Sequence, residues 1–227
     1  MLVNKDLIRI LNLLEKNYPD AKIALNYSNN WELLVSVILS AQCTDLMVNK
    51  VTPFLFKKYK TIDDYARAEI KDLERDIKKT GFFREKAKRI KESAKVIIEK
   101  FHGEVPSKME DILTLPGVAR KTANVVLGNA YGISEGIAVD THVKRVSQRL
   151  RLVDLDKIGG KGINLDYKKD ADPVKIEKEL MRVIPKSKWF KLTYQIIDHG
   201  RSLCKAQNPN CKTCFLIKYC PASRVKL

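Results

Sequence analysis

Lys121 is the residue whose position first suggests chemistry. It lies in the stretch LPGVARKTANVV, residues 115–126, where Leu-Pro-Gly ends one helical segment and an apolar helical run begins at once. Such a corner gathers outward-pointing backbone N–H groups that bind a phosphate without a charged side chain. An ordinary helix-helix corner has the same pattern, so the stretch alone leaves both interpretations open.

The charge of Lys121 is disfavoured at the start of a helix by the helix dipole. That dipole, the neighbouring Arg120 and partial burial would all favour the neutral amine, which is a nucleophile able to form a Schiff base. The simpler interpretation is one surface lysine among many, or a lysine that binds phosphate through its charge.

Asp140 precedes a helical run with apolar residues at 143, 146 and 150. Its simplest role is that of a helix N-cap, with the carboxylate accepting from the N–H of Val143 or its neighbour. The apolar residues 137–139 before it would deliver the carboxylate to a half-buried place. There it could meet Lys121 and help a leaving group depart or stabilise developing positive charge.

Four cysteines near the C-terminus have the spacing C-x6-C-x2-C-x5-C, and they are Cys204, Cys211, Cys214 and Cys220. Thiols clustered in this way in a reducing compartment indicate a metal site. Zinc usually prefers two C-x2-C pairs, whereas a single C-x2-C with wider gaps suits a [4Fe–4S] cluster. The spacing favours the cluster, with zinc as the alternative, and lysines at 205, 212 and 218 could add a phosphate-facing surface.

The net charge of +16 over 227 residues predicts a polyanionic partner, most simply nucleic acid. A Lys-rich, Glu-rich surface with few glutamines would also suit a thermophile. No apolar stretch reaches the ~20 residues that span a bilayer, and residues 1–20 have the spacing of an amphipathic helix rather than of a signal peptide. We therefore expect an intracellular protein with no membrane association.

Helical spacing dominates the chain, so the predicted fold class is all-α. Helices are expected at 31–41 and 85–100, and after Asp172-Pro173 as far as Pro185. Ser107 and Glu110 have the spacing of a capping box. The polar, glycine-bearing stretch 155–172 is expected to be a long surface loop or an insertion.

Four motifs, namely LSAQCTD, LPGVARKTANVV, AVDTHVKRV and the four-cysteine tail, together resemble the endonuclease III family, the iron-sulfur branch of the helix-hairpin-helix DNA glycosylases. The resemblance covers roughly residues 20 to 221. It implies two helical lobes: a six-helix domain at 22–133, with the hairpin at about 107–130, and a second domain of 1–21 plus 134–227, with the cluster loop at 204–220. A monomer that binds damaged double-stranded DNA between the lobes is expected.

The implied activity is that of a bifunctional DNA glycosylase and lyase of base excision repair. Such an enzyme removes oxidised pyrimidines from duplex DNA through a lysine Schiff base and cleaves the strand 3′ to the abasic site by β-elimination. Lys121 matches the family's catalytic lysine and Asp140 its essential aspartate. The family's location implies the cytoplasm or nucleoid of a prokaryote.

The resemblance also implies DNA contacts. His142 matches the histidine next to the aspartate, Gln42 matches the side chain that fills the space left by a flipped nucleotide, and Phe82 stands where the family usually has a leucine wedge. The hairpin contacts are Leu115, Gly117, Ala119 and Arg120. Ala119 replaces a glycine of the family pattern, which is tolerated without strain if its φ is negative.

Three rival functions fit less well. The adenine-mismatch branch of the same fold lacks the lysine and has a glutamate in the helix where this sequence has Ser36. A mismatched-thymine glycosylase of the superfamily would likewise lack Lys121. A non-catalytic DNA-binding module would need neither Lys121 nor Asp140, since a backbone hairpin and basic charge suffice to bind phosphate.

Overall fold

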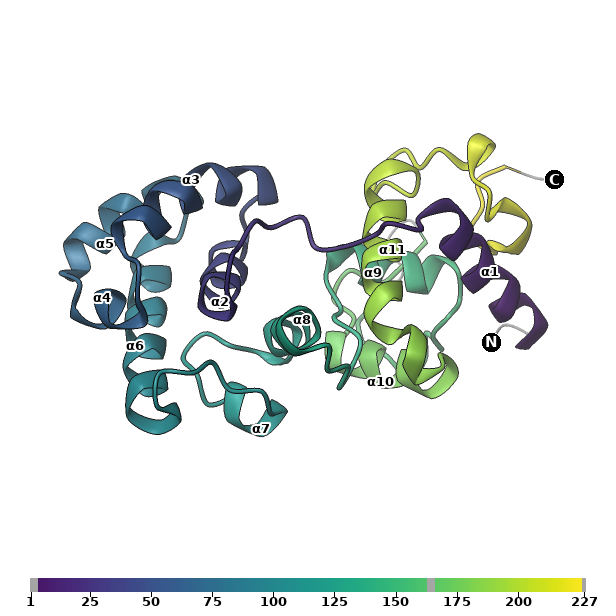
Figure 1. The fold of residues 1–227 in the computed structure, drawn as a ribbon. Helices are drawn as coiled ribbons and strands as arrows, with labels where there is room; N and C mark the ends of the chain where they lie inside the picture. Colours follow the sequence, from purple (N-terminus) through teal and green to yellow (C-terminus); the bar gives the residue numbers. More distant parts are fainter. Residues whose placement is uncertain (1–3, 163–165, 226–227) are drawn as a thin grey trace. The chain divides into compact units, whose positions relative to one another are not determined.

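The computed structural model describes residues 4–162 and 166–225, and every regular element in these ranges is a helix. The all-α prediction is therefore confirmed. The chain forms two compact units, one of residues 23–135 and one of residues 1–22 with 136–227 (Figure 1). Within the described ranges, no helix is both long and apolar enough to cross a membrane.

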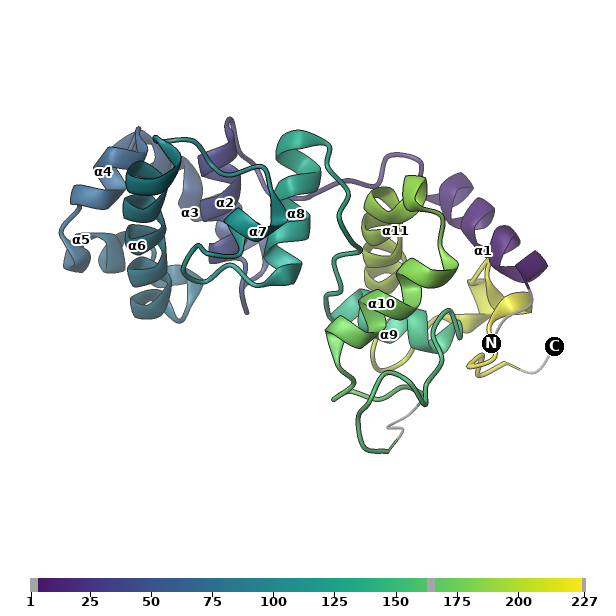
Figure 2. The ribbon, with the colours of Figure 1, turned by 90° about the horizontal axis from the view of Figure 1, so that it is seen from below.

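The unit of residues 23–135 is built around one helix that buries most of its side chains and a longer one that buries a single face. Leu33, Leu34 and Leu39 of one helix are fully buried, as are Ile90 and Ile97 of the other, because their apolar side chains recur at helical spacing. The helices are α2 (Asn30–Leu39), α3 (Asp45–Lys58), α4 (Ile62–Arg67), α5 (Ile70–Asp76), the 3-10 turn η1 (Lys78–Thr80), α6 (Phe83–Phe101), α7 (Met109–Ile112) and α8 (Arg120–Tyr131). Helices α4 and α5 pack on α6, and α2 packs on α8 (Figure 2).

The other unit joins the N-terminal helix to the C-terminal half of the chain. Its elements are α1 (Asn4–Asn17), α9 (Thr141–Arg149), α10 (Pro173–Val183), η2 (Lys186–Lys188), α11 (Trp189–Ser202), η3 (Cys211–Thr213) and η4 (Ile217–Tyr219). Helix α11 packs against α9 and α1. One apolar core contains Leu14 of α1, Val146 of α9, Leu180 of α10 and Ile196 of α11.

The helix boundaries test the cap chemistry read from the sequence. Helix α10 begins after Asp172, whose carboxylate accepts from the N–H of Val174 at 2.8 Å, as predicted. The predicted capping box of Ser107 and Glu110 is wrong. Helix α7 begins one residue later, with Lys108 as N-cap, and this cap makes no side-chain hydrogen bond.

The stretch 155–172 is a loop, as expected, but it is not confined to the surface. Ile158 is fully buried, and Tyr167 and Ala171 are almost so. Its backbone closes on itself where the N–H of Asp172 donates to the carbonyl of Ile158 at 2.9 Å. Residues 163–165 of the predicted loop lie outside the described ranges. The apolar side chains that punctuate this polar stretch anchor it to the core of its unit.

Candidate functional site

The turn between α7 and α8 is tight because of Gly117. This residue has a φ of 81°, in the left-handed region that favours glycine. A Cβ added there would lie 2.5 Å from Cδ of Arg89, so the turn also lies against α6. The hydroxyl of Ser93 donates to the carbonyl of Pro116 at 2.9 Å and fixes the same turn. Leu115 is 2 % exposed and anchors the turn in the core, so it offers DNA little beyond its backbone.

The N-terminus of α8 carries no side-chain cap. Ala119 is the N-cap, with φ −90° and ψ 169°, and makes no side-chain hydrogen bond. This extended conformation suits any L-residue, so alanine replaces the family's glycine without strain. Gly117 and Ala119 are both exposed. An open helix start beside an exposed turn has the geometry that binds an anion through backbone N–H groups.

Lys121 is the second residue of α8 and its side chain is exposed. The partial burial that the sequence suggested is therefore wrong. Arg120 beside it is half-buried. Lys121 does lie in the first turn of α8, next to the positive end of the helix dipole, as the sequence indicated.

Asp140 is the N-cap of α9, as the simplest interpretation of the sequence predicted. Its Oδ1 accepts from the N–H groups of His142 and Val143, both at 2.8 Å. The residue is half-buried, and Ile137 to Val139 before it are buried. Both hydrogen bonds go to the same oxygen, so among the described residues Oδ2 keeps its lone pairs for another partner. The cap and a chemical role are thus compatible in one carboxylate.

His142 is held between α9 and α11. Its Nδ1 lies 3.1 Å from the guanidinium of Arg145, and a Cβ on Gly200 would lie 2.8 Å from the same nitrogen. Gly200 therefore permits the close approach of α11. Burial lowers the pKa of His142, helped by the charge of Arg145 and opposed by Asp140. The ring is consequently neutral near pH 7 and can accept or donate one hydrogen bond.

The four C-terminal cysteines line one cavity, together with Arg149, His199 and Leu203. All four are half-buried free thiols. Burial raises the pKa of Cys220 to about 12 and that of Cys214 above its usual value. Within the described part of the chain, no three Cys, His, Asp or Glu side chains converge closely enough to hold a single metal ion.

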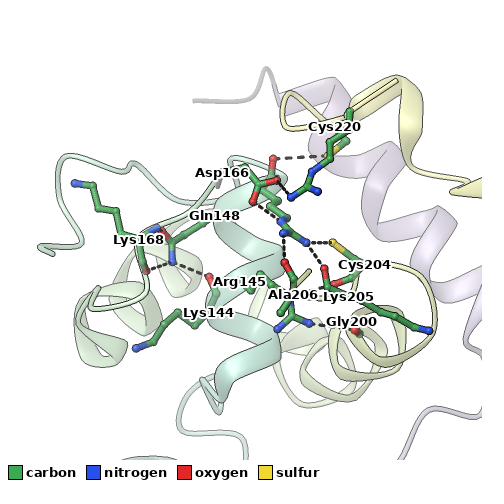
Figure 3. A network of polar contacts seen from close by, with 12 residues as sticks. Lys144, Arg145, Gln148, Asp166, Lys168, Gly200, Cys204, Lys205, Ala206 and Cys220 are labelled. Carbon is green, nitrogen blue, oxygen red and sulfur yellow. Dashed lines mark hydrogen bonds and ion pairs between the residues drawn. The ribbon is translucent and has the colours of Figure 1, made fainter. Parts of the chain in front are cut away.

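Arg149 is a fully buried cation at the edge of this cavity. Its guanidinium donates to Cys204 Sγ at 3.4 Å, to the carbonyls of Lys205 and Ala206 at 2.7 and 2.9 Å, and to Asp166 at 2.8 Å. Figure 3 shows these partners gathered at the end of α9. The sulfur of Cys204 therefore faces the positive charge of a buried guanidinium.

The loop 155–172 supports this arrangement from the other side of α9. The amide of Gln148 donates to the carbonyls of Lys144 and Lys168 and accepts from the N–H of Lys168 (Figure 3). Asp166, two residues earlier in the loop, pairs with Arg149. The loop thus holds the carboxylate that orients the cation beside Cys204.

Gln42 and Phe82, the residues expected to fill space in DNA, share an unusual backbone. Both are non-glycine residues with positive φ, 52° and 48° respectively. Both are exposed, and Phe82 is 64 % exposed although it is a large apolar side chain. A left-handed residue costs about 1 kcal/mol or more and is characteristic of functional sites. Nothing in the two motifs alone predicted this conformation.

The predicted site residues are divided between the two units. Gln42, Phe82, the hairpin and Lys121 belong to residues 23–135, whereas Asp140, His142 and the four cysteines belong to the other unit. Sequence reasoning missed three buried cations, Lys86, Arg145 and Arg149. Arg149 lies four residues after Arg145 in α9, and that spacing of two basic residues beside an apolar face was the only signal available.

Comparisons with known proteins agree on one family. Residues 35–160 match the profile of the HhH-GPD superfamily of base excision DNA repair proteins. The chain is 48 % identical over 215 residues to endonuclease III of Synechocystis sp., covering 95 % of this chain and 91 % of the relative. It is 45 % identical over 203 residues to endonuclease III of Bacillus subtilis, covering 89 % and 86 %. A solved structure of a trapped covalent intermediate of endonuclease III with DNA superposes with a TM-score of 0.88 at 42 % identity and covers 98 % of both chains.

Proposed function

Because the chain belongs to the endonuclease III family of HhH-GPD base excision DNA repair proteins, we propose that this DNA glycosylase is bifunctional. It removes oxidised pyrimidines from duplex DNA and then cleaves the strand 3′ to the abasic site. The observation that carries the proposal is the exposed Lys121 in the first turn of the uncapped helix α8. A non-catalytic binding module has no need of an amine there.

The covalent step begins with the neutral amine of Lys121. The amine attacks C1′, the glycosidic bond breaks, and the base leaves with the bonding electrons and takes up a proton. Loss of the amine proton and opening of the sugar ring leave an imine between Lys121 and C1′. Removal of a proton from C2′ then expels the 3′-phosphate, and water releases the lysine.

Asp140 serves this chemistry through the oxygen that does not cap α9. A carboxylate fixed by two N–H donors keeps its charge and its orientation while positive charge develops on the sugar. The structure of a trapped covalent intermediate of a relative that is 42 % identical supports a covalent step in this family.

The proposed contacts with the flipped nucleotide and one phosphate lie in the unit of residues 23–135, which also carries Lys121. The open N-terminus of α8 and the Gly117 turn take a backbone phosphate, while Gln42 and Phe82 occupy the space of the flipped nucleotide. Flipping is required because C1′ and the base cannot be reached within the stack. The net charge of +16 and the exposed Lys205, Lys212 and Lys218 make binding strongly dependent on salt.

The four cysteines fit a [4Fe–4S] cluster. They line one cavity, and the buried guanidinium of Arg149 donates a hydrogen bond to Cys204 Sγ, which is compatible with a thiolate ligand. Such a cluster, when bound, supplies four Fe–S bonds that fix the loop 204–220. The purified protein is then expected to be brown, with about four irons per chain. A colourless protein with one zinc would contradict this assignment.

Trapping with borohydride tests the proposed function. Wild-type protein mixed with duplex DNA that contains thymine glycol or an abasic site should give a covalent adduct after reduction. Lys121→Gln should give none. Lys175→Gln is the matched control, because Lys175 is also an exposed lysine in the first turn of a helix, α10. No adduct with wild type, or an undiminished adduct with Lys121→Gln, overturns the lyase assignment.

A further inference from the structure

Lys86 is a lysine with almost no contact with water. It lies in the first turn of α6, and only 3 % of the residue is exposed. Its ammonium donates to the carbonyl of Leu39 and to the carbonyl of Thr80, both at 2.8 Å. Burial lowers the pKa of Lys86, and among the described residues the ammonium has no carboxylate partner.

The two carbonyls that Lys86 binds stand before the two segments expected to enter DNA. Leu39 is the last residue of α2, and Gln42 follows three positions later. Thr80 is the last residue of η1, and Phe82 follows two positions later. One nitrogen therefore joins two segments that are distant in sequence. The carbonyl of Leu39 is 47 residues from Lys86, whereas that of Thr80 is only 6 residues away.

The backbone of Lys86 holds a third group in the same place. Its N–H donates to the carbonyl of Phe82 at 3.1 Å. Phe82 itself has φ 48° and follows Gly81, which has φ 68°. Glycine adopts a positive φ readily, whereas Phe82 keeps its left-handed conformation only when its surroundings fix it. The backbone bond is the first intrahelical hydrogen bond of α6, and the side chain of Lys86 adds a second constraint through the carbonyl of Thr80.

Stability alone does not call for an ammonium at this position. Burying a charge without an opposite charge is unfavourable, and a methionine of similar length would fill the space without that penalty. What the ammonium adds is direction, because its N–H bonds fix two carbonyl oxygens relative to each other. The fixed positions of these carbonyls in turn restrain the short backbone segments that lead from Thr80 to Phe82 and from Leu39 to Gln42.

We propose that Lys86 is a positioning residue that sets the spacing of the Gln42 and Phe82 segments, so that both side chains can fill the duplex when a nucleotide flips out. The proposal rests on the proposed function, in which these two residues occupy the DNA stack. Lys86 does not touch the reacting atoms. Its effect is therefore confined to substrates that must be opened before reaction.

The test compares a duplex with a substrate that needs no opening. Lys86→Met should lower the single-turnover rate of base release from a thymine glycol duplex by tenfold or more. The rate at which Lys86→Met is trapped on an abasic site in a single-stranded oligonucleotide should stay within twofold of the wild-type rate. Rates are expressed per active molecule, from the amplitude of the borohydride adduct, so loss of folded protein does not enter them.

Lys91→Met is the matched control. Lys91 lies on the same helix and also donates its ammonium to a backbone carbonyl, that of Ala68 at 2.5 Å, but Ala68 adjoins neither segment. This variant should leave the ratio of duplex to single-strand rates unchanged. If Lys86→Met destabilises the protein severely, Lys86→Arg provides a second test, because it keeps the positive charge. It should still lower the ratio of duplex to single-strand rates, since the N–H groups of a guanidinium lie at other positions than those of an ammonium.

Coupling separates a positioning role from a general structural one. In a Gln42→Ala, Phe82→Ala background, adding Lys86→Met should change the duplex rate by less than twofold, since nothing is left to position. Equal loss on both substrates, an unchanged duplex rate, or full additivity in that background overturns the inference. Failure of the proposed function looks different, because the wild type would then form no adduct on either substrate.

Discussion

Helices α8 and α9 begin in opposite ways, although each carries one of the two residues proposed for catalysis. Helix α8 starts at Ala119 without any side-chain cap, next to an exposed turn. Helix α9 starts at Asp140, whose Oδ1 accepts two backbone N–H groups at 2.8 Å. The first helix start is open to an anion from outside the chain, whereas the second is already occupied by the chain's own carboxylate.

The difference explains why a lysine suits one position and an aspartate the other. At α9 the two N–H groups fix the orientation of the carboxylate at the positive end of the helix dipole. At α8 the same dipole opposes the charge of Lys121, and it also attracts the phosphate that brings the DNA to the amine. An open helix start gives up the stability of a cap in return for a binding site.

Removing the charge of Asp140 should have the largest effect. Asp140→Asn keeps a cap of similar quality but loses the carboxylate, so base release should fall by roughly 10²–10⁴-fold with little change in the free energy of unfolding. Asp140→Ala should lose the same activity and also about 1 kcal/mol of stability. Single-turnover rates and denaturant unfolding measure the two effects. Equal activity of Asp140→Asn and wild type would leave Asp140 as a cap only.

Closing the open start of α8 should have the next largest effect. Ala119→Asp places a cap and a negative charge where the phosphate is proposed to bind, so stability should rise by about 1 kcal/mol while DNA affinity falls about tenfold. Ala119→Ser adds the cap without the charge and should weaken binding less. Unfolding curves and binding at several salt concentrations report both quantities. Unchanged binding by both variants would show that no phosphate lies there.

The Gly117 turn should respond more modestly. Gly117→Ala forces a side chain into the left-handed region and against Arg89, whereas Gly132→Ala meets the same φ penalty with nothing within 4 Å. Both should lose about 1 kcal/mol of stability, and Gly117→Ala should lose more. Only Gly117→Ala should also weaken DNA binding. A matching loss of binding in Gly132→Ala would place the phosphate away from the hairpin.

Lowering the pH should have the smallest effect, a loss of folding stability through His142 in the first turn of α9. Burial lowers the pKa of His142 below its usual 6.5 in the folded protein, so below that pH the unfolded chain takes up a proton that the folded chain does not. This residue therefore destabilises the fold as pH falls through 6.5, by less than about 1.4 kcal/mol per pH unit. The contribution of His142 is isolated by comparing the free energies of unfolding of wild type and His142→Gln from pH 7.5 to 5.5. Parallel pH curves for the two proteins would contradict this account.

Much of the fold could be predicted from the sequence because it depends on local chemistry. The apolar spacing of α2, α6 and α10 and the caps at Asp140 and Asp172 act within one or two turns of helix. The weak cap at α7 could not be placed, because Ser107, Lys108 and their neighbours offer several near-equivalent starts. The burial of Lys121 was also misjudged, since exposure is decided by tertiary packing.

The buried cations could not be predicted from the sequence. Lys86 and Arg149 look like solvent-facing residues in a basic chain, although helical spacing places them near Ile90 and Val146 on the buried faces of their helices. Lys86 binds the carbonyl of Leu39, 47 residues away, and Arg149 binds the sulfur of Cys204, 55 residues away. Only the folded chain reveals that one cation binds the segments before Gln42 and Phe82, and that the other faces Cys204 with Asp166 behind it.

The proposed mechanism requires the amine of Lys121 to bond to C1′ of the damaged nucleotide. Reducing the wild-type adduct with borohydride, digesting the protein and locating the sugar remnant by mass spectrometry identifies the attacking amine. The remnant is expected on the side chain of Lys121. A remnant on any other lysine or on the N-terminal amine would contradict this mechanism.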